Sequence, residues 1–488
     1  MAGCMDRASP RAAPGLATSA KREGSPLDAL GQSEAALQRP AAPEQKRTKT
    51  QHPRHRKKRP VKKADADETV LAAAELMLRE AWLRHHAGAE AVDVPRAFGW
   101  EAGDQQAEAE FCRGPPVPAK LAGGDVAECE LDVWVHEVTE RGVGVAARET
   151  PEQIRELVAG GGRPWVFAVP FVLTGERVRV RSVRHEWGYT QCDLLKVAEK
   201  SALRIDAPCQ YFAQCSGCQL QHVGYQDQLR FKRTVVERAF SDANPLFAKL
   251  PVSPVVQSPL PFGYRTKLTP HFDIRRDTAP EQVPIGFNQA GQRRVLDIED
   301  CIIGTDAVRR GLSKARTDAQ AKMAACKRGA TLLVRETNVP ADDPEGSVAD
   351  VPASELVKDY TLNPKGWVTD VVGDLKFRYP ASSFFQNNAS ILPAFTGYVR
   401  DELQKWNRHL ASAKDGGAGV LRTLIDAYCG SGLFGIACYK DFDKVMGIEI
   451  SNESISCADS NAKMNGANNA AFLLGDASKI FATVDAQP

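Results

Sequence analysis

The chain has 488 residues, 12 cysteines and a formal net charge of only +2. It contains no run of about 18 apolar residues, and its first residues lack the apolar core of a secretory signal, which argues against a membrane span and against secretion. Twelve cysteines in such a chain are more typical of reduced thiols and metal ligands than of a disulfide framework.

Residues 1–66 are predicted to form a disordered basic tail. The first 65 residues hold 15 Lys/Arg against 6 Asp/Glu, whereas the rest of the chain holds 48 against 55. Most of the excess lies in KRTKTQHPRHRKKRPVKK, which fits a nuclear import signal, a loose phosphate-binding arm or a solvated tail. The Arg- and Ser-rich start faintly resembles a mitochondrial presequence, but its prolines disfavour an amphipathic helix. We therefore expect an intracellular protein of the nucleus or cytoplasm rather than of mitochondria.

Residues 67–124 are predicted to contain a packing helix and a linker. The stretch ETVLAAAELMLREAWLRHH combines large apolar residues with strong helix formers. The Gly-, Pro- and Ala-rich sequence after it is typical of a connecting segment.

Residues 125–205 change to short β segments separated by glycine turns, which predicts an OB-like β-barrel. In RVRVR the period of two places arginines on one face of a strand and valines in the core. Cations interleaved with aromatic rings suit phosphates and stacked bases. This pattern predicts an RNA-binding face, with an ordinary solvated strand as the alternative, and its candidate residues are Arg177, Arg179, Arg181 and Arg184.

Residues 206–400 form a central region that opens with CQYFAQCSGCQLQH. Cys209, Cys215 and Cys218 lie within ten residues of one another. A disulfide uses two cysteines and a metal site usually uses four. Three neighbouring cysteines therefore indicate that a fourth ligand lies elsewhere in the chain. Farther along, residues 337–357 are acidic and are predicted to be a loop insertion.

Residues 401–488 contain a strand, a glycine turn and a helix in TLIDAYCGSGLFGIA. A second strand ends at Glu449, 19 residues after Gly430, and a third ends at Asp476. This order predicts a β-α-β-α-β nucleotide-binding half with an acid placed for ribose hydroxyls. The glycines also fit the GxGxxG of a dinucleotide enzyme. Asp426, at the end of the first strand, would repel a pyrophosphate but attract the amino group of S-adenosylmethionine, so we expect the latter cofactor; each acid has a cap or a surface charge as its alternative role.

Several motifs in order resemble the RNA uridine-5-methyltransferases, and the similarity is strongest to the fungal tRNA members. The motifs, from about residue 125 to 488, include GYRTKLTPHF, PIGF, DIEDCIIG, ASSFFQNN and DAYCGSGLFG. The resemblance implies an RNA-binding TRAM barrel, a central iron–sulfur region and a class I, Rossmann-like S-adenosylmethionine-dependent methyltransferase domain, here incomplete. It implies methylation of carbon 5 of a uridine in tRNA, expected at position 54 of the T loop. The alternatives are an rRNA uridine-5-methyltransferase, a non-catalytic RNA-binding protein and an NAD-dependent enzyme.

The resemblance also implies the site residues. Cys301, 83 positions after Cys218, matches the fourth cysteine of members that carry a cluster. A [4Fe–4S] cluster is therefore expected on Cys209, Cys215, Cys218 and Cys301, with zinc or unligated thiols as alternatives. The implied S-adenosylmethionine contacts are Gln386, Asp426, Tyr428, Gly430, Gly432, Glu449 and Asp476.

In this family a cysteine thiolate adds to carbon 6 of uracil, carbon 5 attacks the methyl group, and a carboxylate-class base removes the carbon-5 proton. The resemblance places both groups in segments expected beyond residue 488. We therefore assign no catalytic residue, expect the chain to be a fragment that does not turn over, and infer no obligate protein partner.

Overall fold

The computed structural model describes Val70, residues 73–74, 130–160, 164–186, 188–244, 246–274, 278–412 and 421–476. The predicted basic tail, Trp187 and the linker up to residue 124 lie outside these residues. Of the helix predicted after the tail, Val70, Ala73 and Ala74 are helical, and Val70 and Ala74 are buried against the barrel core. This contact agrees with the packing role predicted for that helix.

The first described unit is a closed five-stranded barrel in the order β1-β2-β3-β5-β4, as predicted. The alternation of residue types along β4 determines the barrel core. Val178 and Val180 are fully buried, whereas the arginines that alternate with them are only half-buried. The helix α3 begins after Thr150, whose side chain forms a capping box with Gln153. The elements are β1 (Glu130–Val138), β2 (Val143–Ala147), α3 (Pro151–Ala159), β3 (Val166–Pro170), β4 (Arg177–Glu186) and β5 (Tyr189–Glu199).

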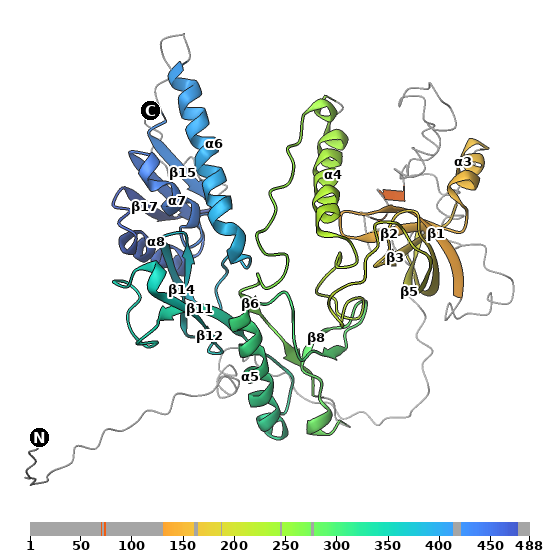
Figure 1. Cartoon of the computed structure of the whole chain (residues 1–488), viewed down its shortest axis with the longest axis horizontal. Coiled ribbons are helices and arrows are strands. Elements are labelled where there is room, and N and C mark those ends of the chain that lie inside the picture. Colours follow the sequence, from red (N-terminus) through yellow and green to blue (C-terminus); the bar gives the residue numbers. More distant parts are fainter. Residues whose placement is uncertain are drawn as a thin grey trace, which may run out of the picture.

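The central region contains small sheets and the long helices α4, α5 and α6, of which α6 lies beside the C-terminal unit (Figure 1). One sheet has the order β10-β7-β8-β9, another β12-β11-β6, and β13 and β14 form a hairpin. The elements are α4 (Tyr225–Ala243), β6 (Lys267–Leu268), β7 (His271–Phe272), β8 (Gly286–Asn288), β9 (Val295–Asp297), α5 (Asp306–Lys322), β10 (Ala330–Thr331), β11 (Val334–Pro340), β12 (Leu356–Thr361), β13 (Trp367–Val372), β14 (Leu375–Pro380) and α6 (Leu392–Ser412). Short 3₁₀ helices are η7 (Phe247–Lys249), η8 (Pro280–Gln282), η9 (Met323–Ala325), η10 (Ala353–Glu355), η11 (Ala389–Ile391) and η12 (Tyr439–Asp441).

The predicted acidic insertion is shorter than its sequence suggested. Strand β11 extends to Pro340, which pairs with Leu356 at the start of β12. Both ends of the predicted 337–357 segment are therefore antiparallel strands, and the loop comprises residues 341–355. Lys376 holds this loop, because its ammonium donates to the carbonyls of Val348, Ala349 and Val351.

The C-terminal unit is a three-stranded parallel sheet in the order β15-β16-β17 with α7 and α8 between the strands. This topology confirms the predicted β-α-β-α-β half. Its elements are β15 (Thr423–Ala427), α7 (Leu433–Cys438), β16 (Lys444–Glu449), α8 (Asn452–Met464) and β17 (Ala470–Leu474). Helix α6 runs across the predicted domain boundary between residues 400 and 401.

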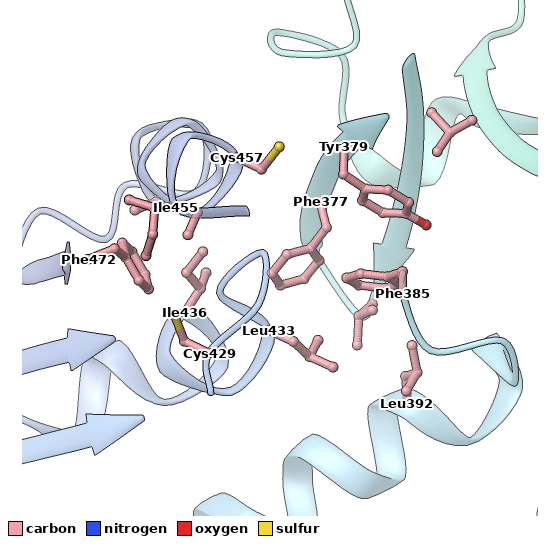
Figure 2. Packing of buried hydrophobic residues seen from close by; sticks show 14 of the residues in the cluster. Phe377, Tyr379, Phe385, Leu392, Cys429, Leu433, Ile436, Ile455, Cys457 and Phe472 are labelled. Carbon is pink, nitrogen blue, oxygen red and sulfur yellow. The ribbon is translucent and has the colours of Figure 1, made fainter. Parts of the chain in front are cut away.

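One hydrophobic core joins the β13–β14 hairpin to the C-terminal unit. Phe377 and Phe385 lie opposite Leu433 and Ile436, and Phe472 closes the far side of the cluster (Figure 2). Two amides reinforce this junction. Asn461 Oδ1 accepts from the Arg378 N–H (2.7 Å), and Asn465 Oδ1 accepts from the Lys376 N–H (2.9 Å). The hairpin and the parallel sheet therefore share one core beside the turn of residues 428–432, which we call the cofactor turn after its predicted role.

Candidate cofactor site and cysteine cluster

The turn after β15 has an unusual backbone that glycine makes possible. Tyr428, Gly430 and Gly432 have φ values of 69°, 54° and 90°, in the left-handed region that favours glycine. A Cβ on Gly432 would lie 2.8 Å from Ile436 Cδ1 and 3.2 Å from Phe472 Cζ. A Cβ on Gly430 would meet no atom within 4 Å. The turn is thus pressed against the core at Gly432 and open at Gly430.

Glu449, at the end of β16, is fixed beside this turn by backbone N–H groups, and its predicted contact with the ribose remains a proposal. Its Oε2 accepts from the Gly430 N–H (3.2 Å), and its Oε1 accepts from the N–H groups of Ile450 (2.9 Å) and Ser451 (3.0 Å). The Gly475 N–H donates to the Glu449 carbonyl (3.0 Å), which places the end of β17 and the following Asp476 next to it. An oriented carboxylate at this position suits ribose hydroxyls, because each carboxylate oxygen accepts more than one hydrogen bond.

Asp426 adopts the capping role that was the alternative to cofactor binding. Its Oδ2 accepts from the Gly435 N–H in the first turn of α7 (2.9 Å). Burial raises the pKa of this carboxyl, and the Gly435 hydrogen bond opposes that increase. One carboxylate oxygen therefore holds the helix in place, and the predicted contact with the cofactor remains a proposal.

The loop that carries Gln386 lies next to the cofactor turn. The Ser383 hydroxyl donates to Glu453 Oε2 on α8 (3.1 Å), and the Lys267 ammonium donates to the Ser382 carbonyl (3.1 Å). Phe385 is stacked on Tyr379, with centroids 4.6 Å apart and an interplanar angle of 16°. Gln386 itself is half-buried. Tyr428, on the other side, is 76% exposed. The structure thus places Tyr428 and Glu449 at one end of the sheet and ties the loop of Gln386 to the start of α8 there through Ser383; the contact of Gln386 with the cofactor remains a proposal.

A buried polar network under this loop was missed by sequence reasoning. The Tyr379 hydroxyl donates to Asp370 and accepts from Arg335 Nη2 (2.5 Å). Arg335 Nη2 also lies 3.6 Å from Asp370 Oδ2. The three residues come from β14, β13 and β11 and are separated by up to 44 positions, so no local pattern relates them. The buried Asn461, whose Nδ2 donates to the Ser431 carbonyl (3.0 Å), was also missed; its only signal was a polar residue on the inner face of a predicted helix.

All four predicted cysteine ligands line one cavity of about 200 Å³. The first three lie on a loop shaped by Ala213, whose φ is 66°. This loop is tied to β8 and to the turn after it, since the Ser216 N–H donates to the Asn288 carbonyl (3.0 Å) and the Ala290 N–H to the Gln214 carbonyl (2.7 Å). Cys301 follows β9 and completes the lining. The pairing with β8 thus brings together cysteines that are far apart in the chain.

The Cys301 segment is held by an ion pair with α5. The Cys301 N–H donates to Asp300 Oδ1 (2.9 Å), and Arg309 donates to both Asp300 oxygens (2.8 and 2.6 Å). Burial raises the pKa of Cys301 to about 11, and the neighbouring thiols of Cys218, Cys209 and Cys215 contribute to this increase. Among the described residues, no group of three or more His, Cys, Asp or Glu is arranged to hold a metal ion. The structure therefore shows four neighbouring thiols around a cavity, and a metal on them remains a proposal.

The arginines predicted to bind RNA lie on one outward face of β4, but carboxylates lie beside them. Arg177 pairs with Glu199 (2.8 Å), Arg179 with Asp132 (3.4 Å), and Arg181 with Glu130 (3.4 Å). Arg184 pairs with Glu186. The period of two in ELDVW places Glu130 and Asp132 on one face of β1, but only the pairing of β1 with β4 places them next to these arginines. The face is a ladder of ion pairs rather than a positive stripe.

The described cysteines of the C-terminal unit are packing residues. Cys429 and Cys438 are buried, and burial raises the pKa of these thiols to about 12 and about 11, respectively. Burial also raises the pKa of Cys457. A thiol nucleophile acts as the thiolate. We therefore assign none of these three residues to catalysis.

The helices in the described part of the chain include none that is long and apolar enough to cross a bilayer.

Sequence comparisons find similarity to methyltransferases. A family model for a methyltransferase domain matches residues 421–487. The tRNA (uracil(54)-C(5))-methyltransferase of Saccharomyces cerevisiae is 36% identical over 397 residues, covering 72% of this chain and 60% of that protein. The Schizosaccharomyces pombe protein with the same name is 39% identical over 329 residues, covering 66% and 58%. The chain thus spans about 60% of the length of these two relatives.

An uncharacterized RNA methyltransferase of Listeria innocua is 31% identical over 355 residues, covering 64% of this chain and 74% of that protein. Among solved structures, the Pyrococcus abyssi tRNA (uracil-54, C5)-methyltransferase in complex with S-adenosyl-L-homocysteine matches with a TM-score of 0.46 and 18% identity, over 71% of this chain and 80% of that one. The sequence relatives and the ordered motifs lead to the same conclusion: the chain belongs to a family of RNA methyltransferases.

Proposed function

We propose that this protein transfers a methyl group from S-adenosylmethionine to carbon 5 of a uridine in tRNA, at position 54 of the T loop. The observation that carries the proposal is the convergence of the Gln386 loop, the glycine turn and Glu449 at one end of the parallel sheet. Ligands of open α/β sheets bind at the carboxyl ends of the strands. The yeast relatives bear names that specify this reaction.

The residues present fit S-adenosylmethionine. Glu449 holds its carboxylate against the turn and accepts from ribose hydroxyls, while the open space above Gly430 lets the ligand approach the backbone closely. Tyr428 places an exposed ring beside this space. Gln386 and Asp426 contact the ligand from the hairpin side and from the end of β15, and Asp476 closes the site at the end of β17. The bound cofactor supplies an electrophilic methyl group on its sulfonium.

Cofactor binding is tested by calorimetric titration of the protein with S-adenosylhomocysteine. Glu449→Ala removes the ribose acceptor and is expected to weaken binding about 10- to 100-fold, as loss of a charged hydrogen-bonding partner does. Asp459→Asn, an equal change of charge at an exposed site on α8, is the control and leaves the affinity unchanged. Equal affinities for the wild type and Glu449→Ala contradict the assignment of this site. Protection of the protein against thermal unfolding by NAD, and not by S-adenosylmethionine, supports the dinucleotide alternative.

The substrate is tested with tritiated S-adenosylmethionine and an unmodified tRNA transcript. We expect label in tRNA, and its loss when uridine 54 is replaced by cytidine, from a protein that also carries the catalytic cysteine and base of the family, since none of the described residues is assigned to catalysis. Label in rRNA alone supports the rRNA alternative, and tRNA binding that is insensitive to Glu449→Ala, without transfer, supports a non-catalytic RNA-binding protein. The proposed chemistry proceeds through a cysteine adduct at carbon 6, for which the buried thiols of residues 421–476 are unsuited.

We also propose that Cys209, Cys215, Cys218 and Cys301 hold a [4Fe–4S] cluster that stabilises the central region. The support is chemical, since four thiols that face one cavity form the ligand set of such a cluster. Tetrahedral zinc uses the same residues but brings them around a single ion. Zinc is therefore the alternative that the metal analysis has to separate from a cluster.

Iron and acid-labile sulfide analysis after anaerobic purification tests this cluster. Cys301→Ser is expected to lose iron and sulfide together. Cys326→Ser, a half-buried thiol outside the cavity lining, is the matched control and keeps both. Zinc without sulfide in the wild-type protein contradicts the proposal.

A further inference from the structure

The four arginines of β4 leave open which cations contact RNA, since each of them is paired with a carboxylate. The exposed face of the β13–β14 hairpin offers a different arrangement. Arg378 is exposed, and its guanidinium carbon lies 5.3 Å from the ring centroid of Trp367. Within the described residues Arg378 makes no ion pair, whereas Arg177, which lies over Trp134 on the barrel, pairs with Glu199 and Asp132. The hairpin therefore presents an aromatic ring with a cation that no described carboxylate neutralises.

Trp367 and Arg378 form the exposed part of this side of the hairpin, whereas Thr369 and Lys376 on the same side are buried. Trp367 opposes Pro380 and Thr369 opposes Arg378, so the tryptophan and the arginine are diagonal neighbours on one face. The Trp367 side chain is 54% exposed, although tryptophan is usually well buried. The opposite face carries Phe377 in the core. The exposed Lys365, two positions before Trp367, adds a second cation. We call Lys365, Trp367 and Arg378 the hairpin patch.

The hairpin patch borders the loop of the proposed active site. The Ala381 N–H donates to the Gly366 carbonyl (2.8 Å), so the residue before Trp367 is hydrogen-bonded to the first residue of the segment that continues to Gln386. An RNA that delivers a uridine to that loop therefore passes next to the hairpin. A cation over an exposed ring, with a second cation two positions away in the chain, suits a phosphate and a stacked base, because guanidinium and ammonium groups pair with phosphates and rings stack on any base. They do not form the broad apolar area that a protein partner would bury.

We propose that the hairpin patch binds the RNA substrate, stacking an unpaired base on Trp367 while Arg378 and Lys365 contact the adjacent phosphates. This inference rests on the proposed function, because it assumes an RNA substrate. Within the described region, the proposal assigns the main RNA contact to the hairpin beside the cofactor site and not to the barrel arginines.

Fluorescence anisotropy with labelled, unmodified tRNA tests the proposal. Trp367→Ala is expected to weaken binding about 5- to 100-fold, the range for loss of one stacked base, and Trp367→Phe to restore most of the affinity. Arg378→Gln is expected to weaken binding and to reduce the slope of log K against log salt by about one. Arg179→Gln, which removes a barrel arginine already paired with carboxylates, is the matched control and changes tRNA affinity less than twofold.

A second measurement separates the possible failures. Titration of each variant with S-adenosylhomocysteine is expected to give wild-type affinity, which shows that the hairpin and the cofactor site remain folded. Unchanged tRNA affinity in both Trp367→Ala and Arg378→Gln overturns the hairpin patch and leaves the proposed function standing. Strong loss in Arg179→Gln, without loss in Trp367→Ala, overturns it in favour of the barrel. Absence of tRNA binding by the wild-type protein overturns the proposed function together with the patch.

Discussion

Replacement of Gly432 by alanine is expected to destabilise the C-terminal unit by about 2–5 kcal/mol. A residue with a Cβ costs roughly 1–2 kcal/mol in the left-handed conformation that Gly432 adopts, with φ 90° and ψ 19°. The added methyl group also meets Ile436 Cδ1 at 2.8 Å and Phe472 Cζ at 3.2 Å. Forcing one carbon into a packed core costs a further 1–3 kcal/mol or so.

Gly430→Ala is the matched control within the same turn. Gly430 also has a positive φ, 54°, but an added Cβ meets no atom within 4 Å. Its expected cost is therefore the conformational part alone, about 1–2 kcal/mol. The difference between the two variants, about 1–3 kcal/mol, isolates the contact of the turn with Ile436 and Phe472.

Urea unfolding followed by circular dichroism measures both variants against the wild type. An unchanged dependence on urea with a lower midpoint for Gly432→Ala than for Gly430→Ala supports the reasoning. Equal midpoints for the two variants refute it, because the turn would then not be packed against the core at Gly432. S-adenosylhomocysteine affinity, measured in parallel, shows how far each change also disturbs the ligand site.

Three further outcomes are expected from other parts of the structure. Tyr379→Phe removes the hydroxyl that joins Arg335 to Asp370 and is expected to cost about 1–3 kcal/mol in urea unfolding; no loss would show that the buried network is dispensable. Burial lowers the pKa of His222 to about 4 from 6.5, so the unfolded chain takes up the proton first. The free energy of unfolding therefore keeps its full contribution from His222 above pH 6.5 and falls by about 2–3 kcal/mol towards pH 4. A His222→Phe variant with the same pH dependence would contradict this cause. Lys376→Met removes the ammonium that donates to three loop carbonyls, so faster proteolysis within residues 341–355 is expected. An unchanged rate of proteolysis would show that other contacts hold this loop.

The local features of this protein were accessible from its sequence. The period of two in RVRVR placed Val178 and Val180 in the barrel core, and the strand–turn–helix order around Gly430 placed Glu449 beside the glycine turn. These features depend on neighbours a few residues apart, or on a topology that connects parallel strands in only one common way. The family followed from motifs in order along the chain.

The tertiary structure decided what depends on residues distant in sequence. It showed that Glu130 and Asp132 neutralise the barrel arginines, and that Asp426 holds the start of α7. Each outcome is an electrostatic or packing contact between different strands and helices, and periodicity within one element carries no information about what lies opposite it. The same reason explains why the hairpin patch was not predicted: Trp367 and Arg378 become neighbours only through the register of two paired strands.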